Sequence, residues 1–416
     1  MKFLAVFLFF SISLVAHSAS QKYFAYGCNI ADEDGNIVRA YMAEGTECAY
    51  FKNGDILIQH EKSVSYHNKN MELLWSKNIS PHHEVNFTSD EKYILVIALE
   101  QHHFFNQDVF FDVIYKLDRK GNVVAKWDTF SHWKDLEKRR FYERYDLYSD
   151  DFSCKKKNLS SLDDDSIDIC FRRNSFALKL TNGDGSHSLY EEFSHINAVH
   201  EIPRNKLEKN PILKKGNIIV TMNAFGAVAI FDPNFTKILY WKRFNDIFHP
   251  AHQIHDAQIL SNGNILVFNN INFSTRFDSQ AFDASIDVES PALTCHEESF
   301  MLVHYKYLTY SNVLEINPLS SKIEWLYQAY PMEQFYVRKG GNAQSLENGA
   351  HLISIRTNDY NESDSNGAII INKAGKVIKQ LKLKKHGMAN QNKFYSFMLR
   401  IRLLDLQSFL DNNNGG

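Results

Sequence analysis

The sequence has little net charge and no concentration of basic residues. Its 416 residues carry 46 Lys and Arg against 49 Asp and Glu, which gives a formal net charge of −3. Proteins that bind nucleic acid or anionic membranes usually gather Lys and Arg on one face. The even scatter of basic residues therefore argues against nucleic acid and against a membrane surface as partners.

Cysteine is also scarce, and the linear motifs of metal sites are missing. The chain has 5 Cys, with no CxxC pair, and none of its 18 His stands in an HxH or HExxH motif. These spacings mark many zinc sites, so we expect no metal and no cofactor. In an oxidising compartment the chain can form two disulfides, Cys28 with Cys48 and Cys154 with Cys170, and Cys295 then has no partner among the five.

Long apolar runs are missing after the first residues. The stretch MKFLAVFLFFSISLVAHSAS has one Lys, an apolar run from Phe3 to Val15, and small residues at Ala16 and Ser18. That run is shorter than the roughly 20 apolar residues of a membrane span. It has the parts of a secretory signal peptide. We predict a signal peptide at residues 1–18 and export of residues 19–416 to the periplasm or the extracellular space.

What the sequence does contain is one short pattern that recurs. A polar turn is followed by three or four apolar residues, and further on by an apolar strand, an Asp or Asn, and another strand. The first halves read NGDILIQ from Asn53, DEKYILVIA from Asp90, KGNIIVTMN from Lys215, NGNILVFNN from Asn262 and NGAHLISIR from Asn348. Short alternating strands with such turns are typical of antiparallel hairpins.

Repeated antiparallel units of this size predict an all-β fold, a six-bladed β-propeller in which the blades close a ring. Five repeats are visible, and we expect both termini to build the sixth blade, from the segments that begin at Gly27 and Lys393. A two-sheet sandwich or a pair of β domains is the alternative. Residues 131–192 fall outside the pattern and are interpreted as a solvated insertion pinned by Cys154 and Cys170, or else as a lid.

Polar residues stand just ahead of the recurring strands in several repeats, where loops of a propeller converge on the central axis. They are His82 and His83, His195 and Asn197, His252, His255 and Asp256, and Asn342 and Gln344. A neutral imidazole is a competent nucleophile, and a hydrogen-bonding imidazole stabilises a transferring oxyanion. Any single histidine is most simply a surface residue. The shared position favours His83, His195 and His255 as one catalytic group.

Five stretches, in this order, resemble motifs of the secreted bacterial arylsulfotransferases. They are HINAV from His195, GNIIVTM from Gly216, AIFD from Ala229, IHDAQILSNGNILVFNN from Ile254 and GGNAQSLENG from Gly340. The resemblance extends from about Phe51 to Leu381. It implies a six-bladed propeller that moves a sulfuryl group from an aryl sulfate to a phenol through a sulfated histidine, without a nucleotide donor. It implies His255 as nucleophile, with His83, His195 and Asn197 binding the sulfuryl and phenolic oxygens.

One position departs from that family. Members commonly carry Arg where this chain has Asn223, and an arginine holds a sulfate with two parallel hydrogen bonds. The equivalent position in a later repeat is Arg356. We hypothesise that Arg356 supplies the missing charge and binds substrate together with Asn223 and Asn197, the alternative being that Arg356 faces solvent.

Three functions are consistent with these observations. The first is a sulfotransferase whose partners are an aryl sulfate and a phenol. The second is a propeller without catalysis that binds an anionic or aromatic ligand, or a protein, at the mouth of the channel. The third is a hydrolase or lyase that uses the same histidines on sulfated or uronic sugars.

Overall fold

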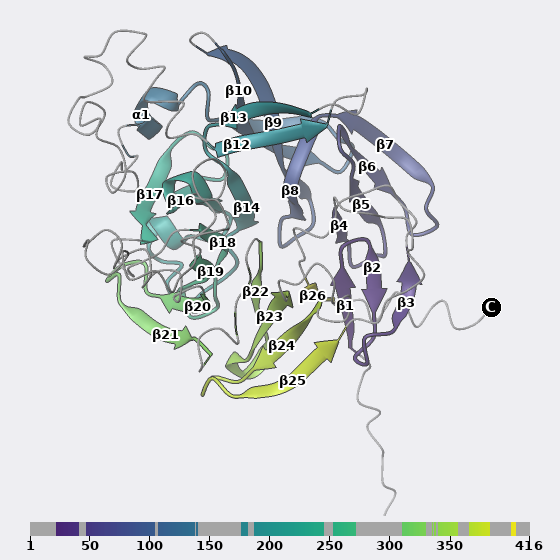
Figure 1. Cartoon of the computed structure of the whole chain (residues 1–416), viewed down its shortest axis with the longest axis vertical. Helices are drawn as coiled ribbons and strands as arrows, with labels where there is room; N and C mark the ends of the chain where they lie inside the picture. Colours follow the sequence, from purple (N-terminus) through teal and green to yellow (C-terminus); the bar gives the residue numbers. More distant parts are fainter. Residues whose placement is uncertain are drawn as a thin grey trace, which may run out of the picture.

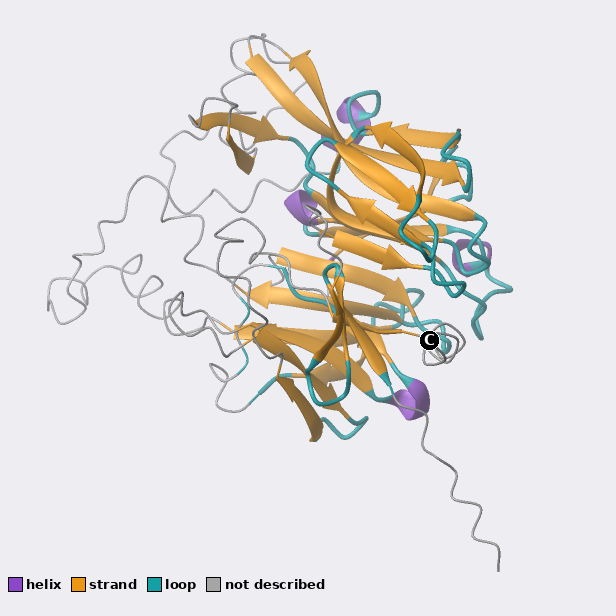
Figure 2. Ribbon diagram, turned by 90° about the vertical axis from the view of Figure 1, so that its right-hand side faces the viewer, coloured by secondary structure: helices purple, strands orange, loops and turns teal. Residues whose placement is uncertain are grey.

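A computed structural model shows the six-bladed β-propeller that the sequence predicts (Figure 1). It describes residues 22–40, 47–104, 107–137, 139, 176–181, 187–244, 253–271, 310–329, 335, 337, 340–356, 366–382 and 401–404. Viewed from the side, the described chain consists of β-strands joined by loops and turns, with a few short helices (Figure 2). These are α1 (Trp133–Glu137) and the 3-10 helices η3 (Pro211–Leu213), η4 (Asn223–Phe225) and η9 (Glu347–Gly349).

Each blade is an antiparallel sheet, and we number the blades in chain order. Blade 1 is β4 (Glu47–Tyr50), β5 (Ile56–Gln59), β6 (Ser63–His67) and β7 (Leu73–Asn78). Blade 2 is β8 (Ser80–Phe87), β9 (Tyr93–Phe104), β10 (Gln107–Asp118) and β11 (Val123–Asp128). Blade 3 is β14 (Ile196–Glu201), β15 (Ile218–Met222), β16 (Ala227–Phe231) and β17 (Ile238–Arg243).

The remaining blades repeat this order. Blade 4 is β18 (Gln253–Ile259), β19 (Ile265–Ile271), β20 (Tyr310–Ile316) and β21 (Ile323–Tyr327). Blade 5 is β22 (Ala343–Ser345), β23 (His351–Arg356), β24 (Asn366–Ile371) and β25 (Val377–Lys382). Blade 6 is β26 (Ile401–Leu404), β1 (Tyr23–Tyr26), β2 (Asn29–Ala31) and β3 (Ile37–Ala40).

An Asp or Asn begins the turn between the last two strands of every blade. Its side-chain oxygen accepts backbone N–H groups of the same turn, as when Asp118 Oδ1 accepts from Lys120 N at 2.9 Å and from Asn122 N at 2.8 Å. Such local bonds favour a turn over a continued strand. The equivalent residues are Asp32, Asn68, Asp232, Asn317 and Asn372. The recurring Asp or Asn of the sequence pattern is therefore this turn residue.

Apolar clusters hold the blades together face to face. The described residues form one cluster at each junction between neighbouring blades, and Phe111 with Val220 (blades 2 and 3) and Val267 with Ile219 (blades 4 and 3) are examples. The other four clusters join blades 6 and 1, 1 and 2, 4 and 5, and 5 and 6. Each blade buries both faces in this way, which is why a single repeat cannot fold by itself.

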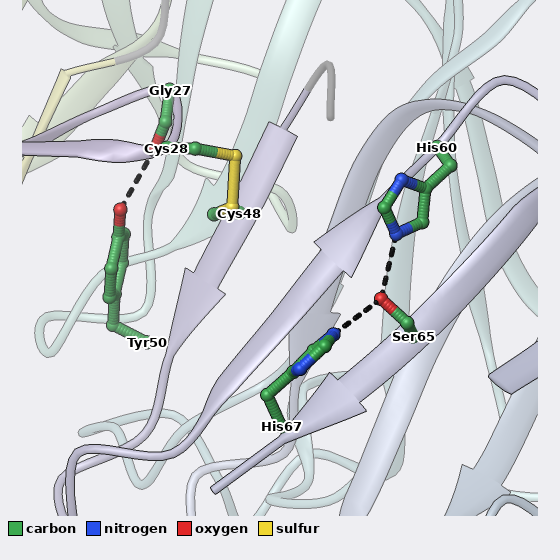
Figure 3. The surroundings of a disulfide bond; sticks show 7 residues. All are labelled: Gly27, Cys28, Cys48, Tyr50, His60, Ser65 and His67. Carbon is green, nitrogen blue, oxygen red and sulfur yellow. Dashed lines mark hydrogen bonds between the residues drawn. A yellow bond between two sulfur atoms is a disulfide. The ribbon is translucent and has the colours of Figure 1, made fainter. Parts of the chain in front are cut away.

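Both termini build blade 6, as predicted. Strand β26 pairs with β1 in register Phe24 to Leu403, and the two lie side by side in Figure 1. Two contacts fasten this blade to its neighbours. A disulfide joins Cys28 to Cys48 of blade 1, so that predicted pair is confirmed (Figure 3). On the other side, Lys379 of blade 5 donates to the carboxylate of Glu33.

The insertion is partly β-structure and extends blade 2. Strands β12 (Phe176–Thr181) and β13 (His187–Glu192) form a hairpin, and β13 pairs in parallel with β10 at Val109 and Phe110. The structure thus adds two strands within a segment that we expected to be a solvated insertion or a lid. Residues 140–175, with Cys154 and Cys170, lie outside the described residues, as do Cys295 and residues 1–21. Within the described ranges no helix has the length and apolar character to cross a membrane.

The strands that the sequence pattern identifies are the second strands of the blades, not the innermost ones. The innermost strands are β26, β4, β8, β14, β18 and β22, which surround the axis in Figure 1. The candidate residues are therefore in or at the start of the inner strands, and our placement of them in loops upstream was wrong. Inner strands such as β8, SPHHEVNF, lack the apolar alternation because polar side chains line them.

Candidate functional site

The inner strands of blades 2, 3 and 4 share a break in their pairing. Residues with positive φ stand at it, His83 (59°), His195 (47°) and Asp256 (53°). The register shifts between Pro81 and Val85 in β8, between Ile196 and Ala198 in β14, and between His255 and Gln258 in β18. A β-bulge redirects the side chains around it, and a positive φ is unusual for residues other than Gly. Three successive blades thus use the same device where the candidate histidines stand.

The structure brings His83 and His195 into direct contact. Their ring centroids lie 4.6 Å apart at an interplanar angle of 85°. His83 is 8% exposed. Two residues separated by more than a hundred positions therefore meet across the junction of blades 2 and 3, as the sequence analysis expected for this pair.

A histidine and an aspartate behind His83 complete this group. His82 Nδ1 lies 2.5 Å from His83 Nδ1, and His82 Nε2 lies 2.8 Å from Asp112 Oδ1, an ion-pair distance without hydrogen-bond geometry. Asp112 is fully buried and accepts a hydrogen bond from Ser194 Oγ. A carboxylate favours the proton on the ring nitrogen that faces it. His82 Nδ1 then accepts from His83 Nδ1, which leaves a lone pair on His83 Nε2.

Sequence reasoning missed Asp112 and Ser194 and did not select His82. Asp112 lies in the middle of β10, within the apolar run VFFDVIY, where a buried charge is unusual unless it is paired. An aspartate in the middle of such an apolar run was the sequence feature that could have identified Asp112 as a functional residue. Ser194 stands directly before His195, and it had no sequence signal of its own.

His255 lies at the junction of blades 3 and 4 and contacts Asn223. Asn223 Nδ2 lies 3.4 Å from His255 Nε2, and the two residues are 3% and 5% exposed. Asn223 sits in η4, whose first N–H donates to the carbonyl of His195 at 3.1 Å. Asn223 therefore connects the His83–His195 pair to His255, and we call these residues, with His82 and Asp112, the imidazole cluster.

Asn197 acts on the backbone next to His255. It is fully buried, and its Nδ2 donates to the carbonyl of Ile254 at 2.8 Å. This bond ties β14 to β18 one residue before His255. The contact fits a residue that positions the His255 backbone, whereas we had expected Asn197 to bind substrate.

Asp256 turns toward other residues of the inner strands. Its Oδ1 lies 2.7 Å from His200 Nε2, and Gln258 Nε2 donates to its Oδ2 at 3.4 Å. Arg356 ends β23 opposite Asn366, and its side chain lies outside what the structure describes. His249 and His252 are also outside the described residues. The proposed role of Arg356 thus stays a prediction.

Chemically, the imidazole cluster offers three different groups. His255 presents a nitrogen beside an amide, the His83–His195 pair presents imidazole edges and faces, and Asp112 with His82 polarises His83 from behind. Neighbouring imidazoles in different surroundings can divide the roles of nucleophile and acid or base. The burial of most of these side chains excludes bulk water, which strengthens polar interactions inside the site.

Comparisons with known proteins find solved structures of similar arrangement but no family. No family model matches the chain, and no curated protein matches it. The resemblance to arylsulfotransferases therefore stays a prediction.

Solved structures with a similar arrangement include a protein of unknown function from Bacteroides caccae, at 16% identity and a TM-score of 0.48 over 93% of this chain and 100% of that one. Another is hydrazine synthase of Kuenenia stuttgartiensis, at 10% identity and a TM-score of 0.39 over 83% of this chain and 68% of that one. The WD40 domain of Neurospora crassa Pan2 is similar at 8% identity and a TM-score of 0.38, over 81% of this chain and 65% of that one. Likeness at these levels says nothing about activity.

Proposed function

We propose that the protein transfers a sulfuryl group from an aryl sulfate to a phenol, with His255 as the nucleophile. The observation that carries the proposal is the cluster itself. Three inner strands, each broken by a bulge, supply imidazoles to one connected group, and Asn223 links His255 to the pair formed by His83 and His195. Two of the ordered motifs that resemble arylsulfotransferases, those from His195 and from Ile254, lie on β14 and β18.

In the first step His255 Nε2 attacks sulfur. An N–S bond forms, the bond between sulfur and the aryl oxygen breaks, and the phenolate leaves with the electron pair. His83, which holds a second proton on Nε2 when the donor binds, gives that proton to the departing oxygen. Asn223 Nδ2, beside His255 Nε2, is in reach of an oxygen of the transferring group and stabilises the charge that gathers there.

The second step reverses these roles. An acceptor phenol gives its proton to the imidazole that lost one, and its oxygen attacks the sulfur of sulfated His255. The N–S bond breaks, and its electron pair returns to His255. Asp112, through His82, favours proton uptake at His83 Nε2. The reaction needs no nucleotide and no metal ion in this scheme.

The test is a two-substrate assay with intact-protein mass spectrometry. We expect an aryl sulfate and a phenol to give the transferred aryl sulfate, and donor alone to add one SO₃ to the protein. His255→Asn should lower transfer by more than ~10³-fold and abolish the adduct. His103→Asn, which removes an exposed imidazole of β9, is the matched control. Release of free sulfate alone would favour a hydrolase, and an adduct in His255→Asn would overturn the assignment of the nucleophile.

A second candidate is a propeller that binds an anionic or aromatic ligand, or a protein, without turnover. The favouring observation is that Asn223, where arylsulfotransferases commonly carry Arg, occupies the position next to His255. Binding of an aryl sulfate without adduct or product would support this candidate.

Arg356→Ala tests whether Arg356 binds the sulfate or faces solvent. Unchanged donor affinity and rate in this variant would mean that Arg356 is not part of the site.

The location we propose is the periplasm or the extracellular space. The disulfide between Cys28 and Cys48 supports it, because disulfides persist mainly in oxidising compartments. Fractionation of the producing cells tests this location.

A further inference from the structure

We propose that Glu84, His200 and Asp256 bind a divalent metal ion of the zinc and manganese group between blades 2, 3 and 4. One ligand comes from each inner strand, β8, β14 and β18. One nitrogen or oxygen of each side chain lies within 4.8 Å of the corresponding atoms of the other two. We call these three residues the acidic triad. It uses side chains that the imidazole cluster does not use.

The distances suit a small metal ion. His200 Nε2 lies 2.7 Å from Asp256 Oδ1 and 3.6 Å from Glu84 Oε2. Ligands at the usual ~2.0–2.2 Å from a tetrahedral zinc ion stand roughly 3.3–3.6 Å from one another. The 3.6 Å separation matches that value, and the 2.7 Å separation, which is a hydrogen bond without the ion, has to widen on binding. A ligand set of one imidazole and two carboxylates suits Zn²⁺ and Mn²⁺ better than it suits Mg²⁺ and Ca²⁺, because those two ions prefer oxygen ligands alone.

Charge gives the second argument. Glu84 and Asp256 are 0% and 1% exposed. Asn86 Nδ2 lies 2.7 Å from His200 Nδ1, and the same amide group donates to the Val199 carbonyl while its oxygen accepts from Phe87 N. His200 Nδ1 is therefore an acceptor, so that Nε2 faces the two carboxylates. Two adjacent carboxylates buried beside one imidazole are costly, and a divalent cation offsets both charges.

Loading the metal changes the tautomer of His200. The ion takes the Nε2 lone pair, and the ring proton moves to Nδ1, so no proton is lost. Asn86 must then present its carbonyl oxygen to Nδ1, as the outer partner of a metal-bound histidine normally does. Asn86 is thus predicted to tune the affinity without touching the ion. The backbone N–H of Val199 donates to Glu84 Oε2 at 3.0 Å and holds that carboxylate in place.

The experiment is metal titration of the full chain after chelation and desalting, with ZnCl₂ and MnCl₂ as probes. We expect one tightly held ion per chain and a rise in unfolding temperature. Glu84→Gln and Asp256→Asn should weaken binding by more than ~10-fold, whereas His103→Gln, which alters an exposed His–Asp pair, should not. Equal binding by Glu84→Gln and the unaltered chain would overturn the proposal, and so would a chain that retains no ion.

Two further measurements test the site even if those variants fail to fold. X-ray absorption of the zinc-loaded chain should show one imidazole among oxygen ligands, whereas several imidazoles would place the ion in the imidazole cluster and refute the site. Asn86→Asp should tighten zinc by ~10-fold, because a carboxylate accepts the Nδ1 proton in either orientation. Asn269→Asp is its matched control, a fully buried Asn in β19 that contacts Asn312. A tightening by both variants, or by neither, contradicts the assignment.

Discussion

Asn223 and His255 face each other across the junction of blades 3 and 4, with 3.4 Å between Asn223 Nδ2 and His255 Nε2. If an aryl sulfate binds here, Asn223→Arg should strengthen binding, because a guanidinium gives two charge-assisted hydrogen bonds to the sulfate. We expect the KM for the donor to fall by about 10-fold or more. Steady-state kinetics measure it, with Asn223→Leu as the control that loses the amide. An unchanged KM would mean that the sulfate does not lie at this position.

Asp112→Asn tests the relay behind His83. The substitution keeps the shape of the side chain and can keep a hydrogen bond to Ser194, so the fold should survive. It removes the charge that favours a proton on His82 Nε2. We expect kcat to fall by ~10²-fold or more, with a changed pH–rate profile. Asp108→Asn, on the exposed partner of His103, is the control, and a normal profile for Asp112→Asn would exclude the relay.

Gly341→Ala tests the close packing that precedes β22. Gly341 has a φ of +98°, and a Cβ there would lie 2.6 Å from the ring of Phe268. Backbone strain and overpacking together should cost roughly 2–5 kcal/mol of the free energy of unfolding. Gly216→Ala is the matched control, with a φ of +92° and nothing nearer than 3.9 Å. Denaturant titration measures both, and equal losses would show that the ring of Phe268 is not the obstacle.

The disulfide should stabilise the ring where blade 6 meets blade 1. Cys28 and Cys48 are 20 residues apart, and cross-linking a loop of that length removes about 3 kcal/mol of unfolded-state entropy. The variant with Ser at both positions should lose about that much stability. Tyr50→Phe, which removes the 3.4 Å hydrogen bond to the Gly27 carbonyl and leaves the disulfide in place, should lose far less (Figure 3). Equal stability of the double variant and the unaltered protein would contradict the prediction.

The ion pair on the other side of blade 6 predicts a pH dependence. The hydrogen bond from Lys379 holds the pKa of Glu33 below its ordinary value of 4.5. A lowered carboxyl pKa adds stability that is complete above 4.5 and is lost as the pH falls through the lowered value. The side chains of the pair are 36% and 35% exposed, so solvent screens it and Glu33→Gln should cost less than ~1 kcal/mol near pH 7. The difference should vanish in acid, and a difference that grew in acid would rule out this origin.

Much of the architecture could be predicted from the chain because the apolar second strands and the Asp or Asn turns recur. Strand β5, ILIQ, is wholly buried, and its pattern is visible without coordinates. The innermost strands could not be recognised in the same way, because β8 carries a proline, two histidines and a glutamate in succession. Strands whose side chains face a polar axis lack the alternation of apolar residues by which strands are recognised in a sequence.

The candidate site was predictable only in part, for a related reason. His83 and His195 could be paired in advance because each precedes a recurring strand, and their rings do meet. Asp112 could not be assigned, because its partner His82 belongs to another strand and no linear spacing relates the two. The acidic triad could not be predicted from the sequence for the same reason, since its three ligands come from three blades and match no zinc motif.

The pairing of β26 with β1 has a consequence for biogenesis. A ribosome makes β26 after all the other described strands, so β1 has no partner from β26 until residues 401–404 have been made. Until then β1 keeps an open edge able to pair with other chains. Removal of residues 401–416, which takes away β26, should therefore leave an aggregation-prone intermediate rather than a slightly smaller propeller.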